Sequence, residues 1–131
     1  MSLKSRLDAH LDASDAYTWA RWGDPHLYSL IAGQGDDYRP AVVTRYTGSV
    51  IIAGRRRPRV DVTLIVAPST TTVYSGGAGV EALEDALVLD LDGVPDAYPR
   101  LLPSQVVYDY RAGGVPGKQR YLAVVVPVLG P

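Results

Sequence analysis

Two stretches rich in β-branched residues, joined by a short basic run, constrain the fold of this chain most strongly. Ala41–Ala53 and Val60–Ala67 are rich in residue types that fit the pleated surface of a sheet. From Val60 to Val66 every other residue is aliphatic, which is typical of a strand with one buried face. The short connection Gly54-Arg55-Arg56-Arg57-Pro58-Arg59 predicts an antiparallel hairpin with the arginines at its tip.

Two further segments show helical periodicity. Ser2–Ala13 has leucines at every fourth position, and Ser2 is a suitable N-cap. Val80–Leu91 has an apolar stripe with acidic residues in its early turns, where the helix dipole favours them, and Gly93 and Pro95 end it. Both helices need a surface to pack on, and we expect the first to lie on the sheet.

A second pair of strands is predicted near the end of the sequence. Val106–Tyr110 and Tyr121–Val128 flank the glycine- and proline-containing loop Arg111–Arg120, and a short strand is expected near Tyr17–Arg21. Together these elements predict the α+β class, with a mostly antiparallel four- to five-stranded sheet and two or more flanking helices. At 131 residues the chain fits a single domain covering residues 1–131.

Composition excludes several classes of function. The chain has no cysteine, which removes disulfides, thiolate zinc sites and cysteine nucleophiles. No apolar stretch approaches the roughly 20 residues that cross a bilayer, and the first residues do not form a signal peptide, so we expect no membrane partner. The net charge of −1 gives no overall attraction to nucleic acid, so any electrostatic role is local.

The sequence contains only weak matches to the patterns of cofactor-binding and metal-binding sites. Gly77-Ala78-Gly79-Val80-Glu81-Ala82 matches a loose dinucleotide-binding pattern, but Glu81 places negative charge where a pyrophosphate would bind. Asp90-Leu91-Asp92-Gly93 resembles part of a calcium loop with the wrong spacing. His10 and His26 have no metal-ligand pattern around them. We therefore expect no enzyme activity, no catalytic residues, no cofactor and no metal.

The basic residues around the first hairpin are the candidate interface. They are Arg55, Arg56, Arg57 and Arg59, joined by Lys118 and Arg120. One interpretation is a solvated turn whose charges prevent wrong strand pairing. The other is a contact with a negative surface, either the acids of an adjoining subunit or DNA phosphates. Nine tyrosines and no phenylalanine suit half-buried positions and interfaces.

In order of elements, the sequence resembles the tail terminator proteins of long-tailed, siphovirus-type bacteriophages, especially those of actinobacterial phages. The segments that carry the resemblance are the helix beginning Met1-Ser2-Leu3-Lys4-Ser5-Arg6-Leu7, the start of the first long strand Arg39-Pro40-Ala41-Val42-Val43, the strand Val60–Val66, the acidic helix Glu81–Leu91 and the closing strand Tyr121–Val128.

The resemblance implies a structural virion protein, assembled in the host cytoplasm and located in the tail or neck. Such a protein forms a homo-oligomeric ring, typically a hexamer, that caps the tail tube and ends its polymerisation. Its partners are copies of itself, the major tail tube protein and the head-tail connector or stopper protein, and DNA passes through its lumen without sequence readout. Two alternatives remain: a head-completion or connector adaptor of the phage neck, and a small nucleic-acid-binding module that uses Arg55–Arg59.

Overall fold

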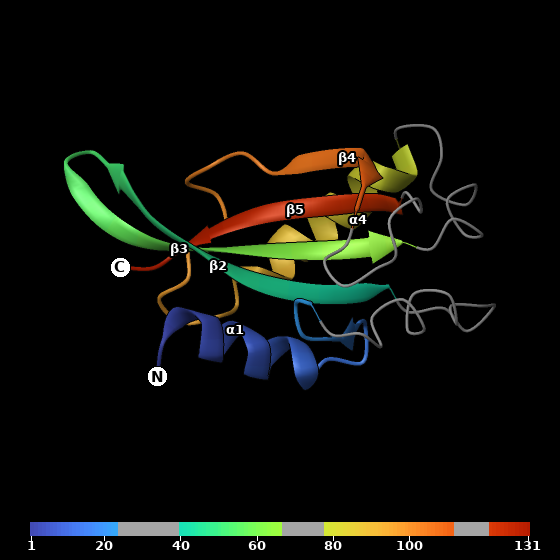
Figure 1. Ribbon diagram of the computed structural model, residues 1–131, viewed down its shortest axis with the longest axis horizontal. Coiled ribbons are helices and arrows are strands. Elements are labelled where there is room, and N and C mark those ends of the chain that lie inside the picture. The colour runs from blue at the N-terminus through green and yellow to red at the C-terminus, as the bar shows by residue number, and fades with distance from the viewer. Residues whose placement is uncertain (24–39, 67–77, 112–120) are drawn as a thin grey trace.

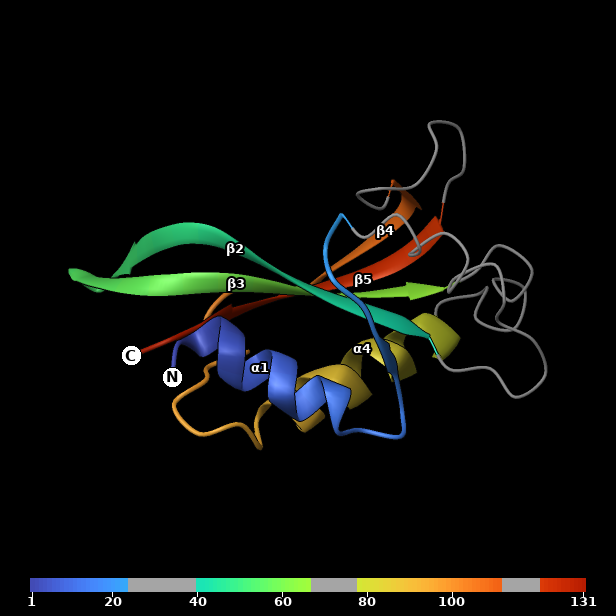
Figure 2. The same cartoon turned by 60° about the horizontal axis from the view of Figure 1, so that its bottom comes forward.

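In the described part of the chain, five strands form one mixed sheet with two helices on one of its faces (Figures 1 and 2). The computed structural model describes residues 1–23, 40–66, 78–111 and 121–131. The sheet order is β1-β2-β3-β5-β4, and the strands are β1 (Thr18–Trp19), β2 (Ala41–Ile52), β3 (Arg55–Val66), β4 (Gln105–Tyr110) and β5 (Tyr121–Leu129). The short β1 runs parallel to β2, and the other neighbouring strands are antiparallel. The expected α+β class is confirmed, with a sheet that is mixed because of β1.

The first helix, α1 (Leu3–Asp12), forms as the sequence predicts. The Ser2 side chain accepts a hydrogen bond from the Ser5 backbone N–H at 3.1 Å, which satisfies one of the free donors of the first turn. Leu3, Leu7 and Leu11 recur every fourth residue and are all buried. Their common face lies against the sheet, so packing rather than helix propensity stabilises this short helix.

The second helix, α4 (Ala78–Leu91), begins two residues before the predicted start and ends where predicted. Its Leu87 and Leu91 are buried against the same face of the sheet as α1, and Leu83 is partly buried there. Figure 2 shows both helices below the sheet, with the opposite face free of helices in the described part of the chain.

The main core lies between the helices and the sheet. Every second residue of β3 from Val60 to Val66, and of β5 from Leu122 to Val128, points to this side and is buried. Each fully buried aliphatic side chain of this size contributes about 1.5–3 kcal/mol relative to its exposed state. The aliphatic residues that alternate in the sequence of β3 are therefore the residues that this strand contributes to the core.

The opposite face of the sheet carries a smaller cluster at one end. Ile65 and Tyr121 are buried there, with Trp22 and Tyr110 packed against them. β5 lies between β3 and β4 and is almost entirely buried, as its continuous apolar run predicts. The predicted hairpin of β4 and β5 is confirmed, whereas most of its loop, Arg111–Arg120, lies outside the described residues.

The arginine run does not form the tip of the first hairpin, and this prediction is wrong. The turn consists of Ala53 and Gly54 alone, with φ of 52° and 76°. A two-residue turn with both φ values positive matches the twist of the flanking strands, so Ile52 pairs directly with Arg55. The arginines belong to β3. Pro58, which belongs to the predicted connection, lies in the strand beside an irregularity in the pairing, where a missing N–H is tolerated.

Candidate contact surfaces

The β2–β3 hairpin extends beyond the rest of the sheet (Figure 1). β3 pairs with β5 only from Arg59 to Val66, whereas it pairs with β2 from Arg55 to Ile65. Residues 49–58, called the distal hairpin below, therefore form a two-stranded ribbon without a third strand. Such a ribbon is marginally stable by itself in water, so its length favours a role in contact with another molecule.

The distal hairpin bends away from the sheet near Gly48. The register of β2 and β3 shifts between Tyr46 and Ser49, and Gly48 has a φ of 101°, which favours glycine. An irregularity of this kind bends a strand and increases its twist. Figure 2 shows the resulting curvature of the ribbon.

Two of the predicted arginines make contacts within the chain at the base of the distal hairpin. Arg57 Nη1 donates to the Gly130 carbonyl oxygen at 3.0 Å, and its guanidinium carbon lies 5.2 Å from the centre of the Tyr98 ring. Arg59 forms an ion pair with Asp61, with Nε and Oδ1 2.8 Å apart. Both arginines are engaged within the chain, and the contacts of Arg57 hold the base of the ribbon against other segments.

The other two arginines point into solvent. Arg55 and Arg56 are exposed, and neither makes an ion pair or hydrogen bond with the described residues. Because successive residues of a strand point to opposite faces, the two cations lie on opposite sides of the ribbon. The remaining predicted members of the basic cluster, Lys118 and Arg120, lie outside the described residues.

Ile51 adds an apolar element to this exposed surface. Its side chain is 66% exposed, and its residue pairs with Arg56 across the ribbon. Cross-strand partners point to the same face, so Ile51 and Arg56 lie side by side. On the other face the corresponding pair is Ile52 and Arg55, and there the isoleucine is less exposed. The hairpin prediction did not identify this pairing, because it depends on the exact position of the turn.

The outer strand β4 is a second possible contact edge. Its pairing with β5 is irregular between Val107 and Tyr110, and it is only six residues long. Short, irregular edge strands resist pairing with another chain. The distal hairpin is therefore the better candidate for a contact.

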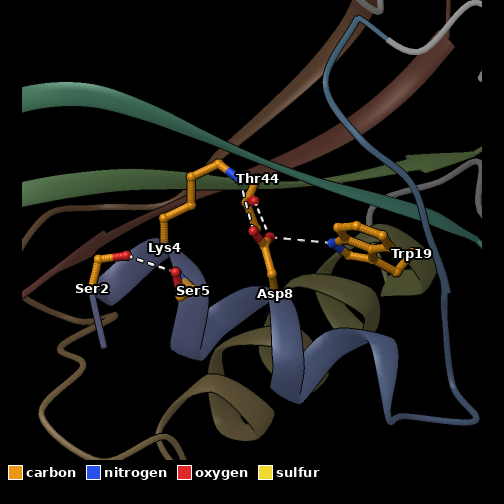
Figure 3. A network of polar contacts seen from close by, with 6 residues as sticks. All are labelled: Ser2, Lys4, Ser5, Asp8, Trp19 and Thr44. Atoms are coloured by element: carbon orange, nitrogen blue, oxygen red, sulfur yellow. Dashed lines mark hydrogen bonds and ion pairs between the residues drawn. The ribbon is translucent and has the colours of Figure 1, made fainter.

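A partly buried carboxylate connects α1 to the sheet (Figure 3). Asp8 accepts from Trp19 Nε1 at 3.2 Å, from the Thr44 hydroxyl, and from Lys4 Nζ at 2.7 Å. These contacts join α1 to both β1 and β2. A surface pocket of about 480 Å³ lies beside them, with Trp22 on its wall and Arg45 stacked on Trp22 at 4.7 Å. Asp8 has three donors, so its role here is to hold elements together.

A second polar contact joins the two helices. His10 Nε2 lies 3.0 Å from Asp90 Oδ1, near the ends of α1 and α4. Burial, and to a lesser extent the neighbouring Asp90 carboxylate, raises the pKa of Tyr17 from 10.0 to about 12. Eighty positions separate His10 and Asp90, and no local pattern in the sequence indicates that they meet.

The acids of the calcium-like segment are engaged within the chain. Asp90 contacts His10, and Asp92 forms an ion pair with Arg100 at 2.6 Å, which raises the pKa of Arg100 through the shared hydrogen bond. Within residues 1–23, 40–66, 78–111 and 121–131, no three His, Asp or Glu side chains come together in a group that could hold a metal ion. The glycine pattern before α4 begins at Gly77, outside the described residues.

Comparison of the chain with protein-family models finds no matching family, and comparison with curated proteins finds no significant match. Among the described residues, neither helix has the length and hydrophobicity needed to cross a membrane. The proposal for function below therefore rests on the geometry of the chain and on the resemblance in its sequence.

Proposed function

We propose that this chain is a tail terminator, a structural virion protein that forms a ring on the end of a phage tail tube. In this role it ends polymerisation of the tube and provides the joint to the head connector. The observation that carries the proposal is the distal hairpin, a ribbon that extends past the sheet and exposes the apolar Ile51 beside Arg56, a cation with no partner among the described residues.

The polar contacts of the described residues support a structural role. Asp8, Asp90 and Asp92 each bind a cation, a histidine or hydrogen-bond donors from another part of the fold. Their contacts fix α1 and the segment after α4. A rigid body with one projecting arm is suited to repeated contacts between subunits, in which the arm of each copy meets the body of the next.

The proposal is tested by adding the protein to polymerising tail tube protein. We expect tubes of reduced length with a ring at one end in negative-stain electron microscopy. Tubes that elongate normally and carry no ring would contradict the proposal. Attachment to portal-side protein instead would favour the connector adaptor, and DNA binding that weakens steeply with salt would favour the nucleic-acid-binding module.

A trimmed variant makes the test specific to the distal hairpin. Residues 51–56 are replaced by Asn-Gly, which forms the favoured two-residue turn between Val50 and Arg57. The change retains Arg57 and its contacts with Gly130 and Tyr98, so the base of the hairpin is preserved. We expect a folded protein by circular dichroism that no longer caps tubes. The matched control is Ala53→Asn, which introduces the same turn in a hairpin of full length.

A further inference from the structure

A surface groove lies between α4 and the segment that precedes β4. Its volume is about 430 Å³. Glu84, Asp85 and Leu89 of α4 form one wall, and Pro99, Leu102 and Pro103 line the other side. The name α4 groove is used below for these six residues. Leu89 is 68% exposed, which leaves an apolar side chain in solvent next to two carboxylates.

The charge of the α4 groove is negative. Glu84 makes no hydrogen bond or ion pair with the described residues, and Asp85 lies near Arg100. Arg100, which also borders the groove, is already bound to Asp92 at 2.6 Å. A cation arriving at this groove therefore meets at least one carboxylate that has no positive partner in the described chain, and apolar surface beside it.

The distal hairpin carries the complementary pair of groups. Arg56 supplies an exposed guanidinium that has no partner in the described part of the chain, and Ile51 supplies an exposed aliphatic side chain on the same face of the ribbon. A guanidinium can bind a carboxylate with two parallel hydrogen bonds, while the isoleucine covers Leu89. Specific interfaces combine an apolar core with a polar rim, and complementary charges across them select the partner.

The hairpin cannot reach the groove of its own chain. In Figures 1 and 2 the ribbon points away from the sheet at one end of the molecule, while α4 lies under the other half. The two surfaces can therefore meet only between copies. Because they are different surfaces, a string of copies has a free groove at one end and a free hairpin at the other. The contact can therefore repeat, and a ring forms where the rotation between copies closes.

We propose that the Ile51–Arg56 face of the distal hairpin binds in the α4 groove of a second copy of this chain. The inference rests on the proposed function, because it assigns the contact that would build the ring. It excludes the Ile52–Arg55 face from the groove. That face has the less exposed isoleucine and points the other way.

Disulfide cross-linking tests the contact directly, since the natural chain has no cysteine. A chain with both Ile51→Cys and Leu89→Cys should form, on mild oxidation, a ladder of covalent oligomers ending at the closed ring. Each single variant should give at most a symmetric dimer. Ile52→Cys combined with Leu89→Cys is the matched control and should give little product, because its sulfur lies on the wrong face. Absence of the ladder, or equal ladders from both pairs, would overturn the proposal.

Charge reversal provides an independent readout on the same ribbon. Arg56→Glu should weaken self-association about 10-fold or more, because it places like charges together. Arg55→Glu makes the same change in net charge one residue away and should have a much smaller effect. Equal effects of the two variants would contradict the assigned face. If the unaltered protein forms rings on tubes but the cross-linking and charge-reversal experiments do not give the expected results, only the binding of the hairpin in the α4 groove is refuted. If it forms no rings at all, the proposed function fails as well.

Discussion

The hydrogen bonds of Asp8 give the most quantitative test of how the body of the protein is held together. Replacement Asp8→Ala removes the acceptor shared by Trp19 Nε1, the Thr44 hydroxyl and Lys4 Nζ. Thr44 is only 1% exposed, so its hydroxyl would lose a partner that water cannot easily replace. Hydrogen bonds to a charged acceptor contribute about 1.5–3 kcal/mol when buried, and a half-exposed ion pair contributes about 0.5 kcal/mol.

Because the Trp19 contact is long and Asp8 is partly exposed, we expect a total loss of about 3 kcal/mol for Asp8→Ala. Asp8→Asn keeps an acceptor but no charge, and should cost about half as much. The measurement is urea unfolding followed by far-ultraviolet circular dichroism, at one protein concentration so that self-association affects every variant equally.

The matched control for this experiment is Asp12→Ala. Asp12 is exposed and lies in the last turn of the same helix, where a negative charge is not favoured by the dipole. Its replacement should change the free energy of unfolding by less than about 0.5 kcal/mol. If Asp8→Ala were no more destabilising than Asp12→Ala, the conclusion that Asp8 joins α1 to the sheet would be wrong.

Three other changes have defined outcomes. Leu7→Ala should lower the free energy of unfolding by about 2–5 kcal/mol in the same urea assay, because Leu7 is completely buried between α1 and the sheet; a loss below 1 kcal/mol would contradict that packing. Ala53→Asn should slow amide hydrogen exchange in the distal hairpin, because asparagine tolerates the positive φ better than alanine; unchanged exchange would contradict the turn. The pKa of Tyr17 is raised from 10.0 to about 12, so folding favours the neutral phenol. The contribution of this shift to stability is complete below pH 10 and is lost as the pH rises from 10 to 12. Tyr17→Phe should remove this part of the alkaline loss, measured by unfolding at stepwise pH, and an identical loss in both proteins would show that Tyr17 does not cause it.

Much of the fold could be predicted because its local patterns agree with its packing. The leucines of α1 repeat at the helical period and the aliphatic residues of β3 alternate, and in both cases the patterned face is the buried face. The β4–β5 hairpin followed from the same reasoning. Such patterns are set by the geometry of one element and do not depend on distant residues.

The errors and omissions have a different cause. The sequence places the arginine run in the connection because it lies between two apolar stretches, whereas the backbone turns already at Ala53 and Gly54. That shift of a few residues separates the engaged Arg57 from the exposed Arg56, which the sequence alone could not distinguish. The partners of Asp8 were also missed. The spacing of Lys4 and Asp8 at four helical positions was a readable signal, but Trp19 and Thr44 meet Asp8 only through the tertiary fold.

The central claim is that this protein acts by joining copies of itself through the distal hairpin. The most direct test is sedimentation velocity of the full-length protein and of the variant trimmed at residues 51–56. Both are measured over a range of concentrations and with tail tube protein present. The account predicts one closed oligomer for the full-length protein and a folded monomer for the trimmed variant. A full-length protein that sediments as a monomer under all these conditions, or a trimmed variant that still forms the closed oligomer, would contradict it.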